Sequence, residues 1–189
     1  MKTRIFWSAT TVLALAMIAQ LFVLTREPSV LTVHASWAHS PKSFAEARQK
    51  AGLIIKAEVL ASEQGPDDVI TMKDGIVDRL PARHVTLRVL KSYKGDLSAG
   101  QTVTLKQTGG IEQNATRTQP FVLEGDPFYQ VGEQYLLLLE RGSTGVLLTI
   151  SPEGRYQIGK SGALTPMVDN ATTREVRGKL LANVEPQLR

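Results

Sequence analysis

The segment from Phe128 to Glu140 reads FYQVGEQYLLLLE and contains an uninterrupted apolar run at residues 135–139. Positions 135–139 are all apolar, so an extended chain would present apolar side chains on both of its faces. A short apolar run after a glycine turn is typical of a fully buried strand, although periodicity alone leaves a short buried helix open. We therefore predict that this segment is the central strand of a small β barrel.

Shorter segments on either side predict the other strands, most of them through alternation of apolar and polar residues. These segments are residues 53–61, 84–91, 102–107, 146–150, 155–158 and 163–166. In the segment 146–150, the alternation predicts that Val146, Leu148 and Ile150 face the interior. The sequence thus supplies enough strands for a barrel around residues 135–139.

Two capping patterns predict helices at the ends of this region. Ser43 followed by Glu46 has the spacing of a capping box and predicts a short helix to about residue 51. Thr172 followed by Glu175 has the same spacing and predicts a helix to about Asn183. We expect the apolar stripe of this second helix to dock on the barrel. The stripe consists of Val176, Leu180, Leu181 and Val184.

Polar segments between the predicted strands are interpreted as loops. Residues 62–68 form one loop, and Lys73-Asp74-Gly75 predicts a hairpin turn. Residues 111–126 form a long, irregular polar segment, and a loop of that length is more often functional than filler. The candidate ligand-facing residues of this region are Glu112, Arg117, Glu124, Asp126 and Tyr129.

Catalytic and metal-binding chemistry has weak support in the sequence. Glu124 and Asp126 would point the same way in an extended chain, as paired carboxylates or a weak Ca²⁺ site would. No acidic cluster completes the six or more oxygen ligands of a calcium site, so a solvated loop is the favoured interpretation. His84 is placed on the outward face of its strand, as a surface histidine. We therefore predict no catalytic residue, no metal site and no cofactor.

The N-terminal segment predicts a membrane span. Lys2 and Arg4 precede an uncharged run over residues 5–24, and a helix of that length is roughly 30 Å long, about the thickness of the hydrocarbon layer. The favoured interpretation is an uncleaved anchor. A cleaved signal peptide and a buried globular helix remain as alternatives. Positive charge before the span places the N-terminus in the cytoplasm and the rest of the chain outside.

Charge and cysteine content exclude several classes of function. Of the 22 Lys and Arg residues, Lys2, Arg4 and Arg26 flank the first apolar segment, which leaves 19 basic residues against 18 acidic ones. Because the remainder is nearly neutral and has no basic cluster, a nucleic-acid partner is not expected. The absence of cysteine excludes disulfides, thiol catalysis and Cys-ligated metals.

Three motifs follow one another along the chain: AGLII at 51–55, VLKSYKG at 89–95 and PFYQVGEQYLLLL at 127–139. Their order resembles a bacterial family of uncharacterised exported or membrane-anchored β-barrel domains, whose motifs read ADLVV, VLKG and P-F-x-x-G-E-x-Y-L-L-F-L. The chain departs from that pattern at Leu138, where the family often has Phe, and at Gly52, where it often has Asp. The resemblance covers roughly residues 43–166. It implies an OB-like barrel, similar to netrin and tissue-inhibitor-of-metalloproteinase domains without their disulfides, and it implies no activity.

We therefore expect a mainly β fold with flanking helices, in the form of a small OB-like closed or partly open β barrel, plus an N-terminal transmembrane helix. The expected divisions are an anchor or signal peptide (1–26), a tether (27–42), the barrel domain (43–167) and a C-terminal helix and tail (168–189).

The expected function is that of an extracytoplasmic, membrane-tethered binding or interaction module and not of an enzyme. A structural or signalling partner of a membrane protein, and a hydrolase, are the alternatives. The expected partners are the membrane, through residues 5–24, and a protein at the membrane, with a monomeric domain favoured. Secretion after cleavage is the alternative localisation.

Overall fold

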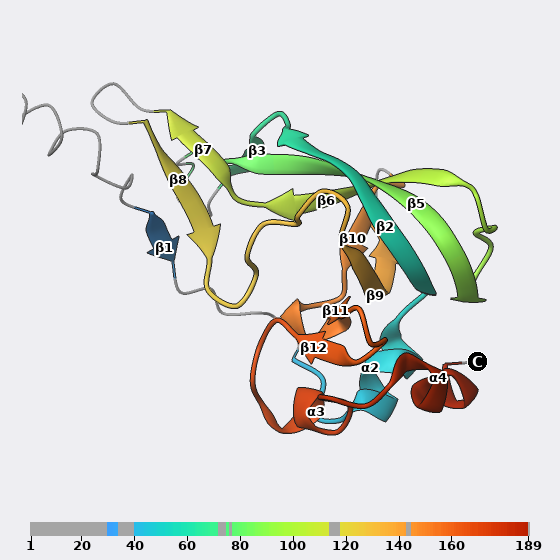
Figure 1. Ribbon diagram of the computed structural model, residues 1–189. Coiled ribbons are helices and arrows are strands. Elements are labelled where there is room, and N and C mark those ends of the chain that lie inside the picture. Colours follow the sequence, from blue (N-terminus) through green and yellow to red (C-terminus); the bar gives the residue numbers. More distant parts are fainter. Residues whose placement is uncertain are drawn as a thin grey trace, which may run out of the picture.

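The computed structural model describes residues 30–33, 40–71, 75, 77–113, 118–142 and 145–188. Five strands close into a barrel, which confirms the predicted mainly β architecture (Figure 1). In order around the barrel they are β2 (Leu53–Gln64), β5 (Ala82–Lys94), β6 (Thr102–Thr108), β10 (Leu147–Thr149) and β9 (Gln134–Arg141), which returns to β2. The chain is therefore organised around one barrel.

One junction of the barrel differs from the other four. Those four junctions are antiparallel, whereas β6 and β10 run parallel. Among the described residues, β6 and β10 pair at a single position, Leu105 opposite Leu147. We call this junction the seam. It is the least extensively paired junction of the barrel.

Strand β9 is buried on both faces, as its apolar run predicts. Tyr135, Leu137 and Leu139 belong to the hydrophobic core inside the barrel, whereas Leu136 and Leu138 belong to a second core outside it. None of the five side chains is more than 2% exposed. The segment is thus a two-sided central strand and not a short buried helix.

The second core lies on the outer face of β9 and β2. Strands β11 (Arg155–Ile158) and β12 (Leu164–Pro166), both predicted, continue the sheet beyond β9 after the short 3₁₀ helix η1 (Pro152–Gly154). Helix α2 (Phe44–Lys50) and the C-terminal segment lie against this part of the sheet (Figure 1). The Phe44 ring meets the Tyr156 ring edge-on at a centroid distance of 5.8 Å. These helices therefore cover the side of β9 that the barrel leaves open.

The predicted cap of α2 is confirmed at Ser43, with one difference. The Ser43 hydroxyl accepts a hydrogen bond from the Glu46 backbone N–H at 3.1 Å. The Glu46 carboxylate accepts from the backbone N–H of Lys42, one residue before the cap. At the other end, the Lys94 ammonium donates to the backbone carbonyls of Arg48 and Gln49, which satisfies acceptors that a helix end leaves open.

The predicted C-terminal helix is wrong in its length and its cap. Two short helices, α3 (Ala171–Arg174) and α4 (Leu181–Val184), are followed by the 3₁₀ helix η2 (Glu185–Gln187). Asn170 caps α3, and Gly178 adopts a φ of 72°, a left-handed conformation that interrupts the helix. Backbone bonds between residues 178–181 and 162–164 then hold the chain extended beside β12. Leu180 is consequently 44% exposed instead of docked.

The predicted loops at 62–68 and 111–126 contain regular structure. Strand β2 continues to Gln64, and β3 (Asp68–Thr71) pairs with β4 (Val77–Leu80) on the two sides of the predicted hairpin turn. Strands β7 (Gly110–Gln113) and β8 (Thr118–Leu123) form a second hairpin, and β1 (Leu31–Val33) adds to β8 in parallel. This three-stranded arm projects from the barrel (Figure 1).

The predicted orientation of residues 146–150 is also wrong. Leu147 is 3% exposed and belongs to the barrel core, whereas Val146, Leu148 and Ile150 are half-buried. Strand β10 is only three residues long, and its pairing with both β9 and β6 turns Leu147 inward. Pairing geometry therefore overrides the apolar alternation of this segment.

The predicted membrane span at residues 5–24 and most of the predicted tether lie outside the described residues. Within the part of the chain that the structure describes, no helix has the length and apolarity needed to cross a bilayer.

Candidate functional site

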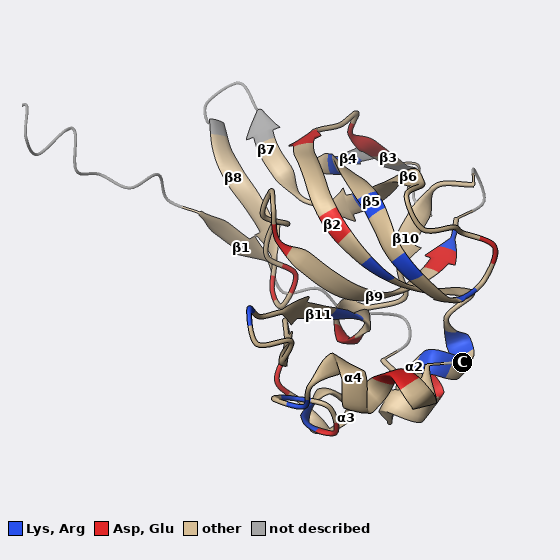
Figure 2. Ribbon diagram, turned by 45° about the vertical axis from the view of Figure 1, so that its right-hand side comes forward, with Lys and Arg blue, Asp and Glu red and all other residues tan. Residues whose placement is uncertain are grey.

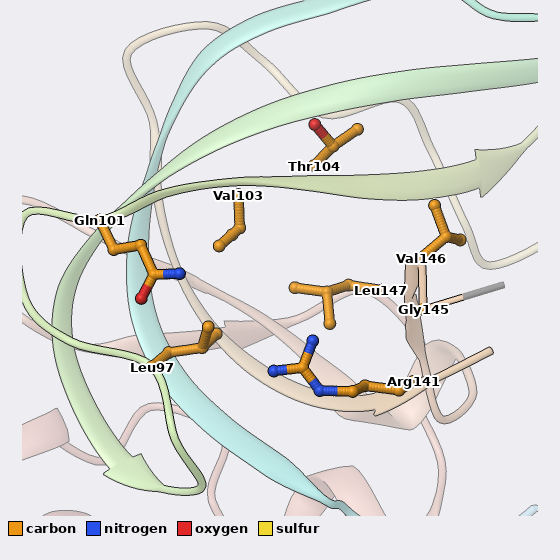
Figure 3. A pocket seen from close by; sticks show the side chains of 8 residues that line it. All are labelled: Leu97, Gln101, Val103, Thr104, Arg141, Gly145, Val146 and Leu147. Carbon is orange, nitrogen blue, oxygen red and sulfur yellow. The ribbon is translucent and has the colours of Figure 1, made fainter. Parts of the chain in front are cut away.

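Two clefts flank the seam, one on each side of the Leu105–Leu147 pair. The large seam cleft has a volume of about 540 Å³, and the small seam cleft has a volume of about 340 Å³. Both volumes lie within the range of small-ligand pockets, roughly 300–1,000 Å³. The large cleft is lined by Pro41, Lys50, Lys106, Gln107, Thr108, Asp126, Glu140, Leu148, Thr149 and Ile150. The small cleft is lined by Leu97, Gln101, Val103, Thr104, Arg141, Gly145, Val146 and Leu147 (Figure 3).

The large seam cleft lies where β6 and β10 separate. Strand β6 pairs with β5 along its whole length, and β10 pairs with β9 along its whole length. Beyond the Leu105–Leu147 pair, residues 106–108 of β6, residues 148–149 of β10 and the following Ile150 line the cleft, and β6 and β10 do not pair with each other there. Two strand edges, with their backbone donors and acceptors, therefore border the same cavity.

The side chains of the large seam cleft carry both signs of charge. Lys106 contributes an ammonium that is bonded to Asp68, and Lys50 contributes one that pairs with Glu46 at 2.9 Å. The exposed residue Glu140 of β9 also lines the cleft. Because the cavity offers cations, a carboxylate and threonine hydroxyls together, its chemistry suits a ligand with alternating donors and acceptors.

A buried arginine supports one wall of this cleft. Arg155 is 1% exposed and donates to the Asp126 carboxylate at 3.0 Å and to the backbone carbonyl of Pro127. Its guanidinium carbon lies 3.5 Å from the ring centroid of Tyr129 and 4.9 Å from that of Tyr135. A charge this deeply buried is stable only when it is paired and hydrogen-bonded. The contacts thus fix residues 126–129 against the sheet.

Gln107 completes the support of this segment from β6. Its amide nitrogen donates to the backbone carbonyls of Asp126 and Pro127 at 3.1 and 3.0 Å. Burial raises the pKa of the Asp126 carboxyl, and the Arg155 guanidinium opposes that increase. Burial also raises the pKa of the Tyr129 hydroxyl. The raised pKa keeps the Tyr129 hydroxyl protonated at neutral pH, and the hydrogen bonds of Arg155 and Gln107 hold this wall in place.

The structure separates the candidate residues of the predicted loop. Asp126 and Tyr129 lie together around Arg155, and Asp126 also lines the large seam cleft. Glu124 is exposed in the turn after β8, and Glu112 lies on β7, paired across the hairpin with Gln119. Arg117 lies outside the described residues. One of the predicted ligand-facing residues therefore reaches a cleft.

Most residues that line the two clefts were not candidates from the sequence. Lys106 and Gln107 end the segment 102–107, which was predicted only as a strand of the barrel. Arg155, which supports the wall from behind, begins the predicted segment 155–158. Alternation along a strand predicts on which face of the sheet a side chain lies. It does not predict where two neighbouring strands separate and leave a cleft. No pattern in the segment RYQI distinguishes a buried arginine from an exposed one, so the sequence held no signal for this wall.

The histidine and carboxylates that an enzyme would need do not converge in the described structure. His84 is half-buried on β5 opposite Lys106, and among the candidate carboxylates of the described chain only Asp126 lines a cleft. Within the described residues, no group of three or more His, Asp or Glu side chains is placed to hold a metal ion. No protein-family model matches the chain, and no curated protein matches its sequence.

Proposed function

We propose that the protein is a membrane-tethered interaction module outside the cytoplasm, and that it binds an extended polypeptide segment of a partner protein in the large seam cleft. The observation that carries this proposal is the pair of strand edges on either side of the cavity, residues 106–108 of β6 and 148–149 of β10. An extended peptide that adds to a strand edge gains main-chain hydrogen bonds there, and its side chains occupy pockets on alternate sides.

The chemistry of the cleft favours a peptide over other ligands. A peptide backbone presents a donor and an acceptor at nearly every residue, which matches the backbone edges and the hydroxyls of Thr108 and Thr149. The cavity is bordered by Lys50, Lys106 and Glu140, so it can accommodate peptide side chains of either charge. Basic and acidic positions are also interspersed over β2 and β5 (Figure 2), without the single-sign field that a nucleic-acid ligand favours.

The barrel topology supports the same proposal. In chain order the five barrel strands are β2, β5, β6, β9 and β10. The first of them, β2, pairs with the second (β5) and the fourth (β9), and the third (β6) pairs in parallel with the fifth (β10). This arrangement is consistent with an OB-like barrel, as the family resemblance implies. OB barrels often bind oligomeric ligands on the face and loops around their second and third strands. Because fold alone does not define function, this analogy is secondary to the cleft itself.

A peptide-display selection against the full-length chain tests the proposal. We expect hydrogen exchange to slow at the amides of residues 106–108 and 148–149 when a selected peptide binds. Thr149→Trp fills the cleft and is expected to lower the affinity by about ten-fold or more. Thr165→Trp, at an exposed position of β12, is the matched control and is expected to bind the peptide normally.

Two outcomes would contradict the peptide site. One is equal affinity of the Thr149→Trp and Thr165→Trp proteins, with both variants shown to be folded by their thermal melts. The other is protection from exchange that appears only away from the two strand edges.

The proposed location has its own test. Lys2 and Arg4 before the span should hold the N-terminus inside the cell. A tag after residue 189 is therefore expected to be digested by protease added to intact cells, whereas a tag before residue 1 is expected to be protected. Protection of the C-terminal tag would contradict the location outside the cytoplasm.

A further inference from the structure

The small seam cleft has a floor made by the barrel core itself. Leu97 and Leu147 are 7% and 3% exposed and belong to the core cluster, and the partly buried Val103 packs against that cluster. These aliphatic side chains line the cavity between the beginnings of β6 and β10 (Figure 3). A short apolar group of a ligand in this cleft could therefore contact side chains of the barrel core.

The polar groups above this floor are mainly hydrogen-bond donors. Figure 3 shows the Arg141 guanidinium and the Gln101 amide directed into the cavity. The Gln101 amide oxygen already accepts from the backbone N–H of Ser98 at 3.1 Å, which leaves the amide nitrogen as the group available to a ligand. Thr104 also lines the cavity. An acceptor with negative charge is the complement of this set.

The Arg141 guanidinium already donates one hydrogen bond to a carboxylate of the protein. Asp96 accepts a hydrogen bond from Arg141 at 2.7 Å, and that hydrogen bond lowers the pKa of the Asp96 carboxyl. The Asp96 side chain is 74% exposed, so the pair is a surface ion pair of small net stability. A bound carboxylate that is shielded by the apolar floor can therefore displace Asp96 at little loss.

We propose that the small seam cleft binds an aliphatic carboxylate, with the carboxylate on Arg141 and Gln101 and the branched or short alkyl group on Leu97, Val103 and Leu147. Two sources supply this chemistry: a free small carboxylic acid, and the C-terminal carboxylate of a polypeptide that ends in Leu or Val. This site is separate from the large seam cleft, and neither proposal depends on the other.

Calorimetric titration of the full-length protein with 4-methylpentanoate, and with the peptide Ala-Ala-Leu, tests the site. We expect at least one of the two ligands to bind, and the ligand with the higher affinity identifies the source. The corresponding alcohol, 4-methylpentanol, and the C-terminally amidated peptide lack the carboxylate and are expected to show no binding.

Three variants separate the proposed contacts. Arg141→Met is expected to weaken binding by about ten-fold or more, because it removes the charged donor. Asp96→Asn is expected to strengthen binding several-fold, because it removes the competing carboxylate. Arg88→Met is the matched control, since Arg88 is also an exposed arginine in a surface ion pair, with Glu58 on the outer face of the barrel. It is expected to leave the affinity unchanged.

Several results would overturn the proposal. They are the absence of binding by both carboxylates, equal binding of 4-methylpentanol, and an Arg141→Met protein that is folded and binds as tightly as the Arg88→Met protein. Weaker binding by Asp96→Asn would show that Asp96 is part of the site and not its competitor, which would also overturn it. None of these variants lies in the large seam cleft, so failure here leaves the peptide proposal to its own test.

Discussion

A guanidinium without contact with solvent is stable only when acceptors and aromatic rings surround it. Arg155 has such surroundings in Asp126, the Pro127 carbonyl and the rings of Tyr129 and Tyr135, although its buried Nε has no hydrogen-bond partner among the described residues. The sequence predicted strand 155–158 but not this cluster, because the partners of Arg155 lie 20 to 29 residues earlier along the chain, at residues 126–129 and on the central strand at Tyr135. Contacts between residues so far apart leave no periodicity that a local pattern can reveal.

Arg155→Met is expected to destabilise the protein by about 3–5 kcal/mol, because it leaves the buried Asp126 carboxylate without its partner. The free energy of unfolding in urea measures the effect. Addition of Asp126→Asn to this variant is expected to recover part of the loss, since the uncompensated charge is then absent. Arg88→Met removes an exposed ion pair and should change stability by less than about 1 kcal/mol. Equal losses for the two arginine variants would contradict the structural role of Arg155.

The central strand gives a second test at the scale of single residues. Leu137 faces the barrel core and Leu138 faces the second core, and both are 0% exposed. Leu137→Ala and Leu138→Ala are therefore each expected to reduce the free energy of unfolding by about 2–5 kcal/mol. Arg88→Ala is the surface reference and should change it by about 0.5 kcal/mol or less. If only one leucine variant were severely destabilised, the strand would be covered on one side only.

At the scale of elements, the success of sequence prediction depended on whether the local pattern or a distant partner determined the structure. Residues 135–139 were predicted correctly because an apolar run requires cover on both sides wherever the strand lies. The arm was missed because β8 is stabilised by β7 and by β1, which lies almost ninety residues earlier. Strand β10 was assigned to the wrong face because pairing with two neighbours, and not its own alternation, sets its orientation.

The C-terminal segment is held to the barrel by an ion pair that acid should weaken. Glu185 of η2 accepts hydrogen bonds from the Lys91 ammonium and the Tyr93 hydroxyl, both at 2.7 Å. The hydrogen bond from Lys91 is the main cause that lowers the pKa of Glu185, with that from Tyr93 second. A carboxyl whose pKa is lowered by folding contributes stability above its unfolded pKa of about 4.3, and this contribution is lost as pH falls through the folded pKa.

Glu185→Gln is therefore expected to lower the urea midpoint at pH 7 and to have a progressively smaller effect as pH falls from about 5 to 3. The comparison of wild-type and variant midpoints across this range measures the contribution. Glu63→Gln, at an exposed position of β2, is the control. A difference between wild type and Glu185→Gln that stays constant with pH would show that Glu185 acts through packing and not through its charge.

At the scale of the whole molecule, the seam joins strands from distant parts of the chain by one described pair, Leu105 and Leu147. Contacts of large sequence separation carry a high loop-closure entropy and often form after the transition state for folding. We expect Leu105→Ala and Leu147→Ala to accelerate unfolding with little change in the folding rate, which corresponds to φ values near zero. Leu87 lies on β5, between its antiparallel neighbours β2 and β6, and Leu87→Ala is expected to slow folding.

Stopped-flow chevron plots of the three variants test this order of events. Folding rates that fall for the seam variants as much as for Leu87→Ala would show that the barrel closes before the transition state.

The position of β1 has a mechanical consequence. The strand joins the described domain through its parallel pairing with β8 and the bond from the Glu124 backbone N–H to the Val33 carbonyl. A pulling force on the chain ahead of residue 30 would therefore load this three-residue contact before it reaches the barrel. Because β1 contributes nothing to the two hydrophobic cores, its detachment would lengthen the connection and leave the barrel folded. Under tension, β1 would therefore detach from β8 before the barrel unfolds.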